Sequence, residues 1–422
     1  MRSGRTSCVT WDDVTVVEPI LFLTHRIPFP PTKGDKVRSF HLLKFLASRY
    51  RVHLGTFIDD PADRIHIGRL QEYCASFKVV EINKTLARIR SLSGFWSGQP
   101  LTLPFYRDGE LAAWVRTVVR ERNIRRAVVF SSVMAQYVAS IDGLRVIVDF
   151  VDVDSAKWDQ FSRTRRWPMS AVFAREGKRL LEFERAVAGR ADASVFVTAG
   201  EAELFRKLAP ECAGRVSHAT MGVDSDFFSP HQELSSPYSA GDEAIVFTGA
   251  MDYWPNIDAV CWFAQESFPA ILAERPQALL YIVGMNPAPA VQALARDARI
   301  VVTGRVADVR PYLRYARVVI APMRIARGIQ SKVLEAMAMA KPVVVSAVAA
   351  SAISGRPGFD YEVADTAQEF ARKTIDLLDD SRGVAIGRSA RARVMTDYRW
   401  ATNLEPFAKL LGLAEMAGVG TP

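Results

Sequence analysis

Short apolar runs alternate with helix-length segments along almost the whole chain, and this alternation limits the fold more than any other feature. Continuous apolar runs predict buried strands at residues 16–24, 52–57, 78–82, 127–131, 145–150, 193–197 and 215–219. They recur from Ile245, Leu279, Arg299, Val318 and Pro342. Runs of this kind are typical of parallel strands covered by helices on both faces. A helix predicted at 36–48 completes a βαβ unit, so we expect an α/β fold.

The alternation breaks at residues 228–243, FSPHQELSSPYSAGDE, where two Ser-Pro pairs favour a linker that buries little. A chain of 422 residues is also long for one core. We therefore expect two doubly wound Rossmann-like domains facing a cleft, at 17–228 and 244–400, joined by a linker at 229–243. Residues 1–16 are expected to be flexible, and residues 401–422 to form a C-terminal helix that packs back toward the first domain.

The segment 327–346, RGIQSKVLEAMAMAKPVVVS, combines a glycine turn, a helix and a buried strand. Gly328 lets the backbone approach a ligand at positive φ, and the N–H groups at the start of the helix suit phosphate oxygens. Lys332 in the first turn could add a charge, and Glu335 could accept hydrogen bonds from the hydroxyls of a ribose. These residues indicate a nucleotide diphosphate site, with an ordinary surface loop and a solvated Lys332–Glu335 pair as the alternative.

The charges and strand ends around this segment point the same way. No carboxylate lies between Asp308 and Glu335, whereas six cations do, which suggests a polyanionic ligand. Ligands of open α/β sheets bind at the carboxyl ends of the strands. We expect four strand-ending residues to line one cleft: Gly249, Gly284, Gly304 and Pro322.

The composition is that of an ordinary soluble protein, with 49% hydrophobic and 24% charged residues. The first residues lack a secretory signal, no window is long enough for a membrane span, and four scattered cysteines indicate neither zinc nor disulfides. These features favour the cytoplasm. One acid among seven cations between residues 26 and 58 predicts a basic surface, suited to anionic lipid, phosphorylated substrate or nucleic acid, or simply solvated. The cations are Arg26, Lys33, Lys36, Arg38, Lys44, Arg49 and Arg51.

An ordered series of motifs resembles the GT-B glycosyltransferases, especially the retaining group called family four. VLEAMAMAKPVVVS from Val333 closely fits the pattern VLEAMAxGxPVV that marks the donor site of that family, with Ala340 at the position of the glycine. Further family-like segments are MGVDSDFFSP from Met221, FTGAMDYWPNIDAVCWF from Phe247, IVGMNP from Ile282 and VTGRVADVRPYLRYARVVIAP from Val302. The resemblance spans nearly the whole chain.

Three further segments are similar to sugar transferases of bacterial exopolysaccharide clusters of the PEP-CTERM/exosortase type. They are PFPPTKGDKVRSF from Pro28, VDFVDVDSAKW from Val148 and RIARGIQSKVLEAMAMAKP from Arg324. The resemblance implies sugar transfer from a UDP- or GDP-sugar to a hydroxyl, with retention and without an essential metal or cofactor.

The resemblance also implies roles for residues on both sides of the cleft. Glu335 would hold the ribose and Lys332 the diphosphate, while Arg305 and Val306 would lie beside the base. Gly249, Gly284 and Gly328 complete the donor-binding set. On the acceptor side, Gly34 belongs to the glycine loop after the first strand, and Asp35 and Arg38 are candidate acceptor contacts.

Three departures from the family pattern affect the residues expected to hold the donor and the acceptor. Arg327 stands where a glutamate usually meets the donor sugar. In GAMDYWPN, Met251, Asp252 and Asn256 replace the cations that often grip the pyrophosphate, so Lys332, with Arg327 or Arg324, would supply that charge. The usual histidine is absent from DFVDVDSAKW, leaving the carboxylates of Asp149, Asp152 and Asp154. We therefore take Asp152, Lys332 and Arg327 as the catalytic candidates.

Two acidic patterns have simpler explanations. DVD at Asp152 matches the DxD signature of metal-dependent transferases, but the two-domain layout contradicts that fold, so we expect no metal site. Glu176, Glu182 and Glu184 read as a solvated helix face, although the family often has a glutamate near Glu184.

The expected reaction is a front-face displacement in which cations and the helix N-terminus stabilise the leaving diphosphate. The acceptor would be a saccharide or a polyprenyl-diphosphate-linked saccharide, and no nucleic acid is expected. The basic regions 26–51 and 116–126, and the segment 85–96 with its Arg, Phe and Trp residues, suit peripheral binding to the inner face of the cell membrane. A sugar-nucleotide epimerase or hydrolase, or a non-catalytic subunit of a polysaccharide assembly complex, remains an alternative.

Overall fold

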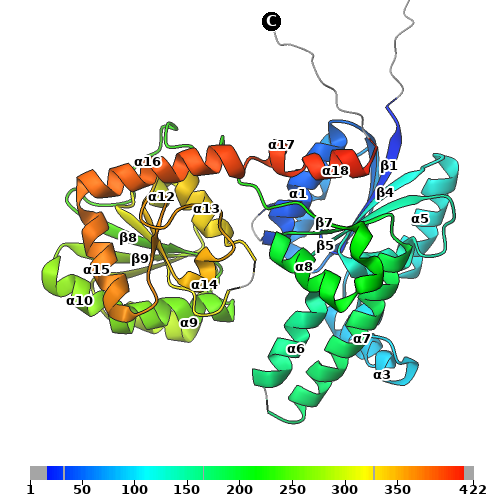
Figure 1. The fold of residues 1–422 in the computed structure, drawn as a ribbon, viewed down its shortest axis with the longest axis horizontal. Helices are drawn as coiled ribbons and strands as arrows, with labels where there is room; N and C mark the ends of the chain where they lie inside the picture. The colour runs from blue at the N-terminus through cyan, green and yellow to red at the C-terminus, as the bar shows by residue number, and fades with distance from the viewer. Residues whose placement is uncertain (1–16, 32–33, 165, 327, 413–422) are drawn as a thin grey trace, which may run out of the picture. The chain divides into compact units, whose positions relative to one another are not determined.

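Two parallel sheets organise the chain in the computed structural model, which describes residues 17–31, 34–164, 166–326 and 328–412 (Figure 1). The first sheet has seven strands and the second has six. The expected α/β fold with two doubly wound sheets is confirmed. None of the helices in the described part of the chain combines the length and the apolar composition that a membrane span requires.

The first sheet has the strand order β3-β2-β1-β4-β5-β6-β7. Its strands are β1 (Pro19–Thr24), β2 (Arg51–Ile58), β3 (Ser76–Glu81), β4 (Arg126–Phe130), β5 (Arg145–Val151), β6 (Ala193–Phe196) and β7 (Val216–His218). All seven were predicted to within a few residues. Leu21 of β1 is paired in parallel with His53 on one side and with Ala127 on the other. The carboxyl ends of β1, β2 and β4 therefore meet at one edge.

The helices of the first half begin with α1 (Gly34–Ala47), which was predicted at 36–48 and buries Phe40, Leu43 and Leu46. Short 3-10 segments follow β2, β4 and α8 at Pro61–Glu72, Ser132–Tyr137 and Pro210–Arg215. The other helices are α2 (Lys84–Ser91), α3 (Ser93–Ser97), α4 (Thr102–Phe105), α5 (Gly109–Glu121), α6 (Asp154–Thr164), α7 (Met169–Arg190) and α8 (Ala199–Leu208).

The second sheet has the strand order β10-β9-β8-β11-β12-β13. Its strands are β8 (Glu243–Thr248), β9 (Ala278–Val283), β10 (Ile300–Gly304), β11 (Val318–Ala321), β12 (Val343–Val345) and β13 (Glu362–Val363). Five were predicted. The sixth, β13, was missed because two residues give no periodic signal.

Helices lie on opposite sides of β8 and β9, with α9 and α10 on one side and α16 on the other (Figure 1). The helix α13 begins at Ser331, next to the predicted start. The helices are α9 (Trp254–Trp262), α10 (Phe268–Glu274), α11 (Pro289–Leu294), α12 (Arg310–Tyr315), α13 (Ser331–Ala338), α14 (Ala347–Ala350), α15 (Ala367–Leu378), α16 (Asp380–Asp397), α17 (Trp400–Asn403) and α18 (Glu405–Leu410). A short π-helical segment, Phe263–Ser267, joins α9 to α10.

The compact units of the chain divide between Ser194 and Val195, with residues 150–153 grouped with the later part. This boundary passes through the first sheet, since strand pairing keeps β6 and β7 in that sheet. Hydrogen bonds between strands hold each sheet together as one layer with its own helices. The predicted boundaries at 228 and 244 stay a prediction, as does the placement of residues 401–422.

The linker residues 229–242 form neither helix nor strand, and none of them is buried, so the prediction that they bury little is confirmed, with Tyr238 as their one aromatic contact with the second sheet's core. The Tyr238 ring centroid lies 4.5 Å from that of Tyr281. Its hydroxyl donates to the carbonyl oxygen of Tyr312 at 2.7 Å. The linker is thus packed onto the second sheet's core by one aromatic side chain.

The glutamates of α7 do not form one solvated face. Glu182 is exposed beside Arg179, as expected, but Glu176 and Glu184 are buried. Glu176 accepts hydrogen bonds from Leu101 N at 2.6 Å and Thr102 N at 3.0 Å, which caps α4. The prediction of a solvated face is therefore wrong for two of the three.

The basic surface predicted near the N-terminus is only partly present among the described residues, since Lys44, Arg49 and Arg51 are exposed but the other three cations are paired with carboxylates. Nζ of Lys36 lies 2.6 Å from a carboxylate oxygen of Asp63, and Arg38 is paired with Asp149. Arg26 contacts two further carboxylates, Asp35 and Asp59. Lys33 lies outside the described residues. The carboxylates that pair with Lys36 and Arg38 belong to Asp63 and Asp149, which lie outside residues 26–58. Counting charges within that stretch therefore could not reveal these ion pairs.

Candidate functional site

Two glycine turns meet at the carboxyl ends of β8 and β9. The amide of Gly249 donates to the carbonyl oxygen of Val283 at 3.0 Å. A Cβ on Gly284 would lie 1.6 Å from the carbonyl oxygen of Gly249, so no side chain fits there. Gly249 has a φ of 158°, and a Cβ on it would lie 2.7 Å from Nδ2 of Asn256. Both glycines therefore let backbone and polar side chains pack closely at this edge.

Lys332 lies in the first turn of α13 and reaches the same place. Its Nζ donates to Oδ1 of Asn256 at 2.6 Å and lies 4.4 Å from the ring centroid of Phe247. Asn256 is buried in α9 and is itself oriented by a hydrogen bond from Nδ2 to the carbonyl oxygen of Ala250 at 2.9 Å. The ammonium is thus held by one amide and one aromatic face rather than by a full ion pair.

Glu335 follows one turn later on α13. Both side chains keep some exposed surface, yet the protein around them removes most of their water. Burial raises the pKa of Glu335 to about 7, against the opposing charge of Lys332. Burial lowers the pKa of Lys332 to about 7, against the charge of Glu335. A largely desolvated cation and carboxyl group of this kind are typical of ligand sites.

The turn before α13 has the conformation that the sequence predicts, with a φ of 62° at Gly328. The N–H groups of the first turn of a helix lack partners within the helix and favour anions. Arg327 lies outside the described residues. Nε of Arg324 donates to Asp258 at 2.8 Å, so the charge of this arginine is already compensated.

Arg305 and Val306 follow β10. Arg305 is exposed, and its Nη2 lies 3.5 Å from the sulfur of Met285, the residue after Gly284. Val306 packs against the core of the second sheet. Their predicted place beside a base stays a prediction.

Asp152 is delivered by a strained turn at the end of β5. Its amide donates to the carbonyl oxygen of Phe150 at 2.9 Å, around Val151 with a φ of 69°. This is a γ-turn of the rare strained form, and a positive φ is costly for a β-branched residue. The next amide, that of Val153, donates to Glu201 at 2.7 Å. Strain of this kind concentrates at functional sites.

Polar side chains gather at the carboxyl edge of the first sheet, after β1, β2 and β4. Asp35, in the first turn of α1, lies 3.5 Å from Nε2 of His25 and contacts Arg26. Burial would raise the pKa of Asp35, but the hydrogen bond with His25 and the charge of Arg26 hold it well below its usual value. Asp59, from the end of β2, completes the pairing of Arg26.

The two other acceptor-side candidates, Gly34 and Arg38, lie on α1. Gly34 is the first residue of α1. Arg38 and Asp149 are both fully buried, with Nε to Oδ2 at 2.8 Å and Nη2 to Oδ1 at 3.1 Å. The pair ties α1 to β5 inside the first half.

The second sheet thus brings Gly249, Gly284, Lys332 and Glu335 together. The first sheet gathers Asp35 with residues that sequence reasoning missed, His25 and Asp59. Asn256 was noted only as a departure from the family, because nothing in the sequence shows that it contacts a lysine 76 positions away. His25 carried one usable signal, its position directly after a predicted strand.

Comparison with known proteins gives a family match for part of the chain and fold matches for nearly all of it. Residues 242–380 match the family model described as Glycosyl transferases group 1. A comparison with curated proteins gave no significant match.

Several solved structures superpose over nearly the full chain. HepE of Anabaena, in complex with UDP and glucose, has a TM-score of 0.65 at 16% identity and covers 93% of this chain and 99% of its own. Sucrose-phosphate synthase of Thermosynechococcus elongatus has a TM-score of 0.69 at 17% identity, and the match covers 95% of this chain and 100% of the synthase. WaaG, a glycosyltransferase involved in lipopolysaccharide biosynthesis, has a TM-score of 0.63 at 16% identity, and the match covers 93% of this chain and 100% of WaaG. With its two Rossmann-like sheets, the chain has the GT-B fold.

Proposed function

We propose that this protein is a retaining glycosyltransferase that moves a sugar from a nucleotide-diphosphate donor to a saccharide or lipid-linked saccharide. The observation that carries the proposal is the pair Lys332 and Glu335 on α13, beside the glycine turns after β8 and β9. A lysine at a helix N-terminus suits a diphosphate, and a carboxylate one turn later suits ribose hydroxyls. The family match over residues 242–380 supports the class of reaction.

The mechanism follows from what these groups can stabilise. Lys332 and the first turn of α13 would stabilise negative charge on the leaving diphosphate, with Arg327 adding a second cation. The acceptor hydroxyl would attack from the same face, and the leaving phosphate would take its proton. Asp152 would contact the donor sugar or the acceptor hydroxyl, held there by the γ-turn at Val151. No step requires a metal ion.

UDP-sugars are the first donors to test, because HepE was solved with UDP and glucose, and GDP-sugars are the second. Arg305 and Val306 would lie beside the base. On the acceptor side, Asp35 with its partner His25 would meet the acceptor beside Gly34. Arg38 is buried, so its contribution would be to hold α1 in place.

The acceptor would be a growing exopolysaccharide or its polyprenyl-diphosphate-linked precursor, as the resemblance of the segments from Pro28 and Val148 implies. A lipid-linked acceptor would place the protein in the cytoplasm, at the inner face of the cell membrane.

Product analysis tests the proposal. Purified protein is incubated with UDP-, GDP- and dTDP-sugars, with and without saccharide or polyprenyl-diphosphate-linked acceptors, in the presence of EDTA. A product that needs the acceptor and keeps the anomeric configuration supports the proposal. Donor turnover without an acceptor would indicate an epimerase or hydrolase, and nucleotide binding without turnover would indicate a non-catalytic subunit. Loss of activity in EDTA would contradict metal independence.

A further inference from the structure

The first half of the chain exposes large apolar side chains at two neighbouring places, α2–α3 and the turn between α6 and α7. The exposed residues are Leu86, Ile89, Leu92, Phe95 and Trp96 at the first place and Phe161, Trp167 and Met169 at the second. Scattered single apolar residues are normal on a protein surface, but contiguous groups mark interaction sites. We call these eight residues together the apolar tip.

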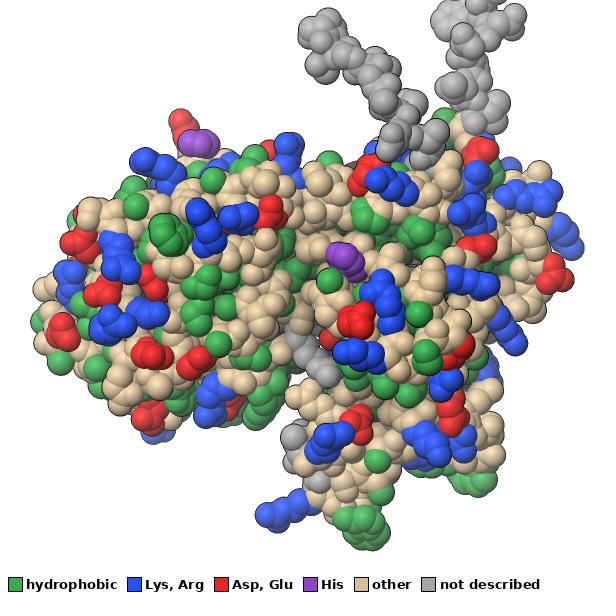
Figure 2. All heavy atoms as spheres, in the orientation of Figure 1, with side chains coloured by type: hydrophobic (Ala, Val, Ile, Leu, Met, Phe, Trp, Pro, Cys, Tyr) green, Lys and Arg blue, Asp and Glu red, His purple; other side chains and the backbone are tan. Residues whose placement is uncertain are grey.

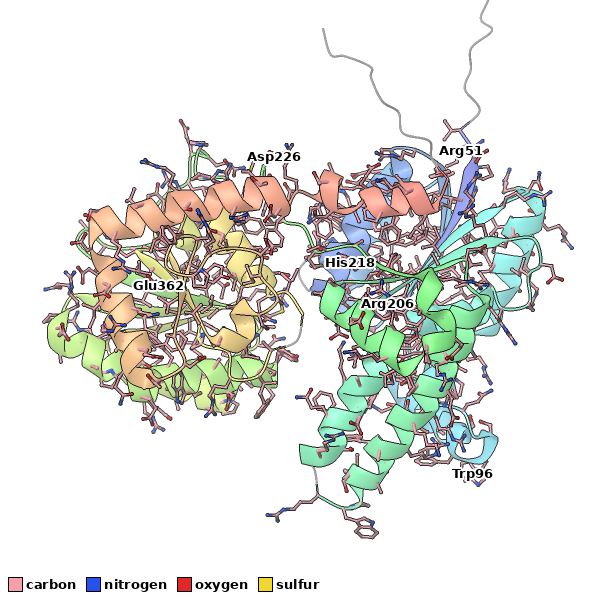
Figure 3. All side chains as sticks on the ribbon, viewed as in Figure 1. Arg51, Trp96, Arg206, His218, Asp226 and Glu362 are labelled. Carbon is pink, nitrogen blue, oxygen red and sulfur yellow. The ribbon has the colours of Figure 1, made fainter. Side chains whose placement is uncertain are left out.

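The stripe on α2 and α3 is amphipathic. Leu86, Ile89, Leu92 and Trp96 are spaced by three or four residues, as on one face of a helix, although Leu92 lies at the junction of α2 and α3. Trp96 is 84% exposed and extends away from the ribbon in Figure 3. A side chain this exposed buries little apolar surface in the fold, so packing within the protein does not account for a tryptophan here.

The turn between α6 and α7 repeats this feature. Trp167 is 83% exposed, and Phe161 and Met169 flank it on the two helices. Figure 2 shows the hydrophobic side chains that project at the lower end of this part of the molecule. Between α6 and α7, Trp158 and Phe173 pack with ring centroids 5.2 Å apart, and this aromatic pair supports the exposed residues at the turn.

The two places belong to one rigid surface because α7 is bonded to the α3–α4 region. The guanidinium of Arg175 lies 4.8 Å from the ring centroid of Phe95, and it donates to the carbonyl oxygen of Gly94. The next residue, Glu176, caps α4 through the amides of Leu101 and Thr102. This network explains why Glu176 is buried.

Cations outnumber acids in the sequence around the tip, where the acid Asp159 pairs with Arg163 at 2.7 Å. No Asp or Glu occurs between Glu81 and Asp108, where four cations stand: Lys84, Arg88, Arg90 and Arg107. None occurs between Asp159 and Glu176, where Arg163, Arg165, Arg166 and Arg175 stand. Exposed aromatic and aliphatic residues flanked by cations suit the interface of a membrane that contains anionic lipids.

We infer that the apolar tip inserts into an anionic lipid surface, with Trp96 and Trp167 at the level of the headgroups and acyl boundary. The cationic flanks oppose pairing with a second copy, since like charges would face each other. The inference deepens the proposed function, on which it rests for the lipid-linked acceptor, but the binding itself needs neither donor nor acceptor.

The other basic regions do not offer such a surface. The cations Arg26, Lys36 and Arg38 are paired with carboxylates. Arg116 and Arg120 on α5 are exposed, but that helix shows no exposed large apolar residue among those described. Arg116 and Arg120 therefore provide a charge-matched control.

The test is flotation of the full-length protein with vesicles of phosphatidylcholine, with and without phosphatidylglycerol, at low salt. The protein should float only with phosphatidylglycerol vesicles. The double variant Trp96→Ala/Trp167→Ala should lower the partition coefficient by more than about tenfold. The variant Lys84→Gln/Arg88→Gln should lower the partition coefficient by about fivefold for each charge removed. The control Arg116→Gln/Arg120→Gln should lower the partition coefficient less than that.

Unchanged thermal unfolding of the tryptophan variant shows that it still folds, independently of any nucleotide binding. The inference is overturned if the wild-type protein does not float with anionic vesicles, if the tryptophan variant floats as well as wild type, or if the α5 control loses as much binding as the tip variants. A dimer in solution that the tryptophan variant dissociates would assign the tip to a second copy instead. UDP binding is measured separately, so failure of the donor site and failure of the membrane surface are distinguishable.

Discussion

Nζ of Lys332 donates a hydrogen bond of 2.6 Å to Oδ1 of Asn256, and Nδ2 of the same amide is fixed by the carbonyl oxygen of Ala250. Asn256 thus determines where the ammonium lies at the start of α13. We expect Asn256→Ala to weaken UDP binding by about tenfold, as for the loss of a hydrogen bond to a charged group. Isothermal titration calorimetry measures this. An affinity equal to wild type would show that Asn256 does not position the lysine.

Gly284 tolerates no side chain, because a Cβ would lie 1.6 Å from the carbonyl oxygen of Gly249. Gly284→Ala should lower the free energy of unfolding by about 3 kcal/mol or more, or prevent soluble expression. The matched control is Gly189→Ala in α7, where a Cβ meets nothing within 4 Å. That change should leave stability the same or raise it by up to about 1 kcal/mol. Equal denaturation midpoints for the two variants would contradict the close approach of the two turns.

UDP binding should be linked to protons with a sign that changes near pH 7. In the free protein the pKa values of Lys332 and Glu335 are both about 7. A diphosphate stabilises the ammonium, so Lys332 takes up a proton when UDP binds at about pH 8. Ribose hydroxyls stabilise the carboxylate, so Glu335 releases a proton at about pH 6. Calorimetry in buffers of different ionisation enthalpy measures both.

Each half of this linkage has its own control variant. Lys332→Met should abolish the uptake at about pH 8, and Glu335→Gln should reduce the release at about pH 6. Binding enthalpies that do not depend on the buffer at either pH would show that the pair does not titrate on binding.

Glu184 should make stability depend on pH. The carboxyl group is fully buried and accepts hydrogen bonds from the amide and hydroxyl of Ser155. Burial raises its pKa to about 8, and the charge of Asp154 adds to this effect. Because the pKa in the folded state exceeds that of the unfolded chain, this stabilisation is full below about pH 4.5 and is lost as pH rises to about 8.

Glu184→Gln can keep the hydrogen bond from the Ser155 amide at its oxygen and donate from its NH2 group to the Ser155 hydroxyl, and it removes the titration. The variant should be more stable than wild type at about pH 8, by a few kcal/mol at most, and similar at about pH 5. Urea denaturation at the two pH values measures the difference. A difference between variant and wild type that stays the same at both pH values would show that Glu184 ionises normally.

Apolar runs predicted twelve of the thirteen strands in the described part of the chain, and the glycine turn at Gly328 predicted a helix directly after it, because both leave continuous local signals. These signals could not predict partners distant in sequence. Glu176 and Glu184 looked solvated because their partners, Thr102 and Ser155, lie 74 and 29 positions away.

The site was predictable to the same extent. The residues of one segment, Gly328, Lys332 and Glu335, could be assigned together because α13 sets their spacing. Tertiary contacts decided the rest. Arg38 is paired with Asp149 from β5, which is distant in sequence. The positive φ of Val151 could not be predicted either, because valine rarely adopts that conformation.

The affinity of UDP for the wild-type protein and for Lys332→Met and Glu335→Gln, measured by calorimetry at about pH 7, tests the donor site most directly. Lys409→Met on α18 and Glu274→Gln on α10 are exposed controls. Both site variants should weaken binding by about tenfold or more, and both controls should bind as wild type does. Wild-type affinity in Lys332→Met and Glu335→Gln would contradict the account.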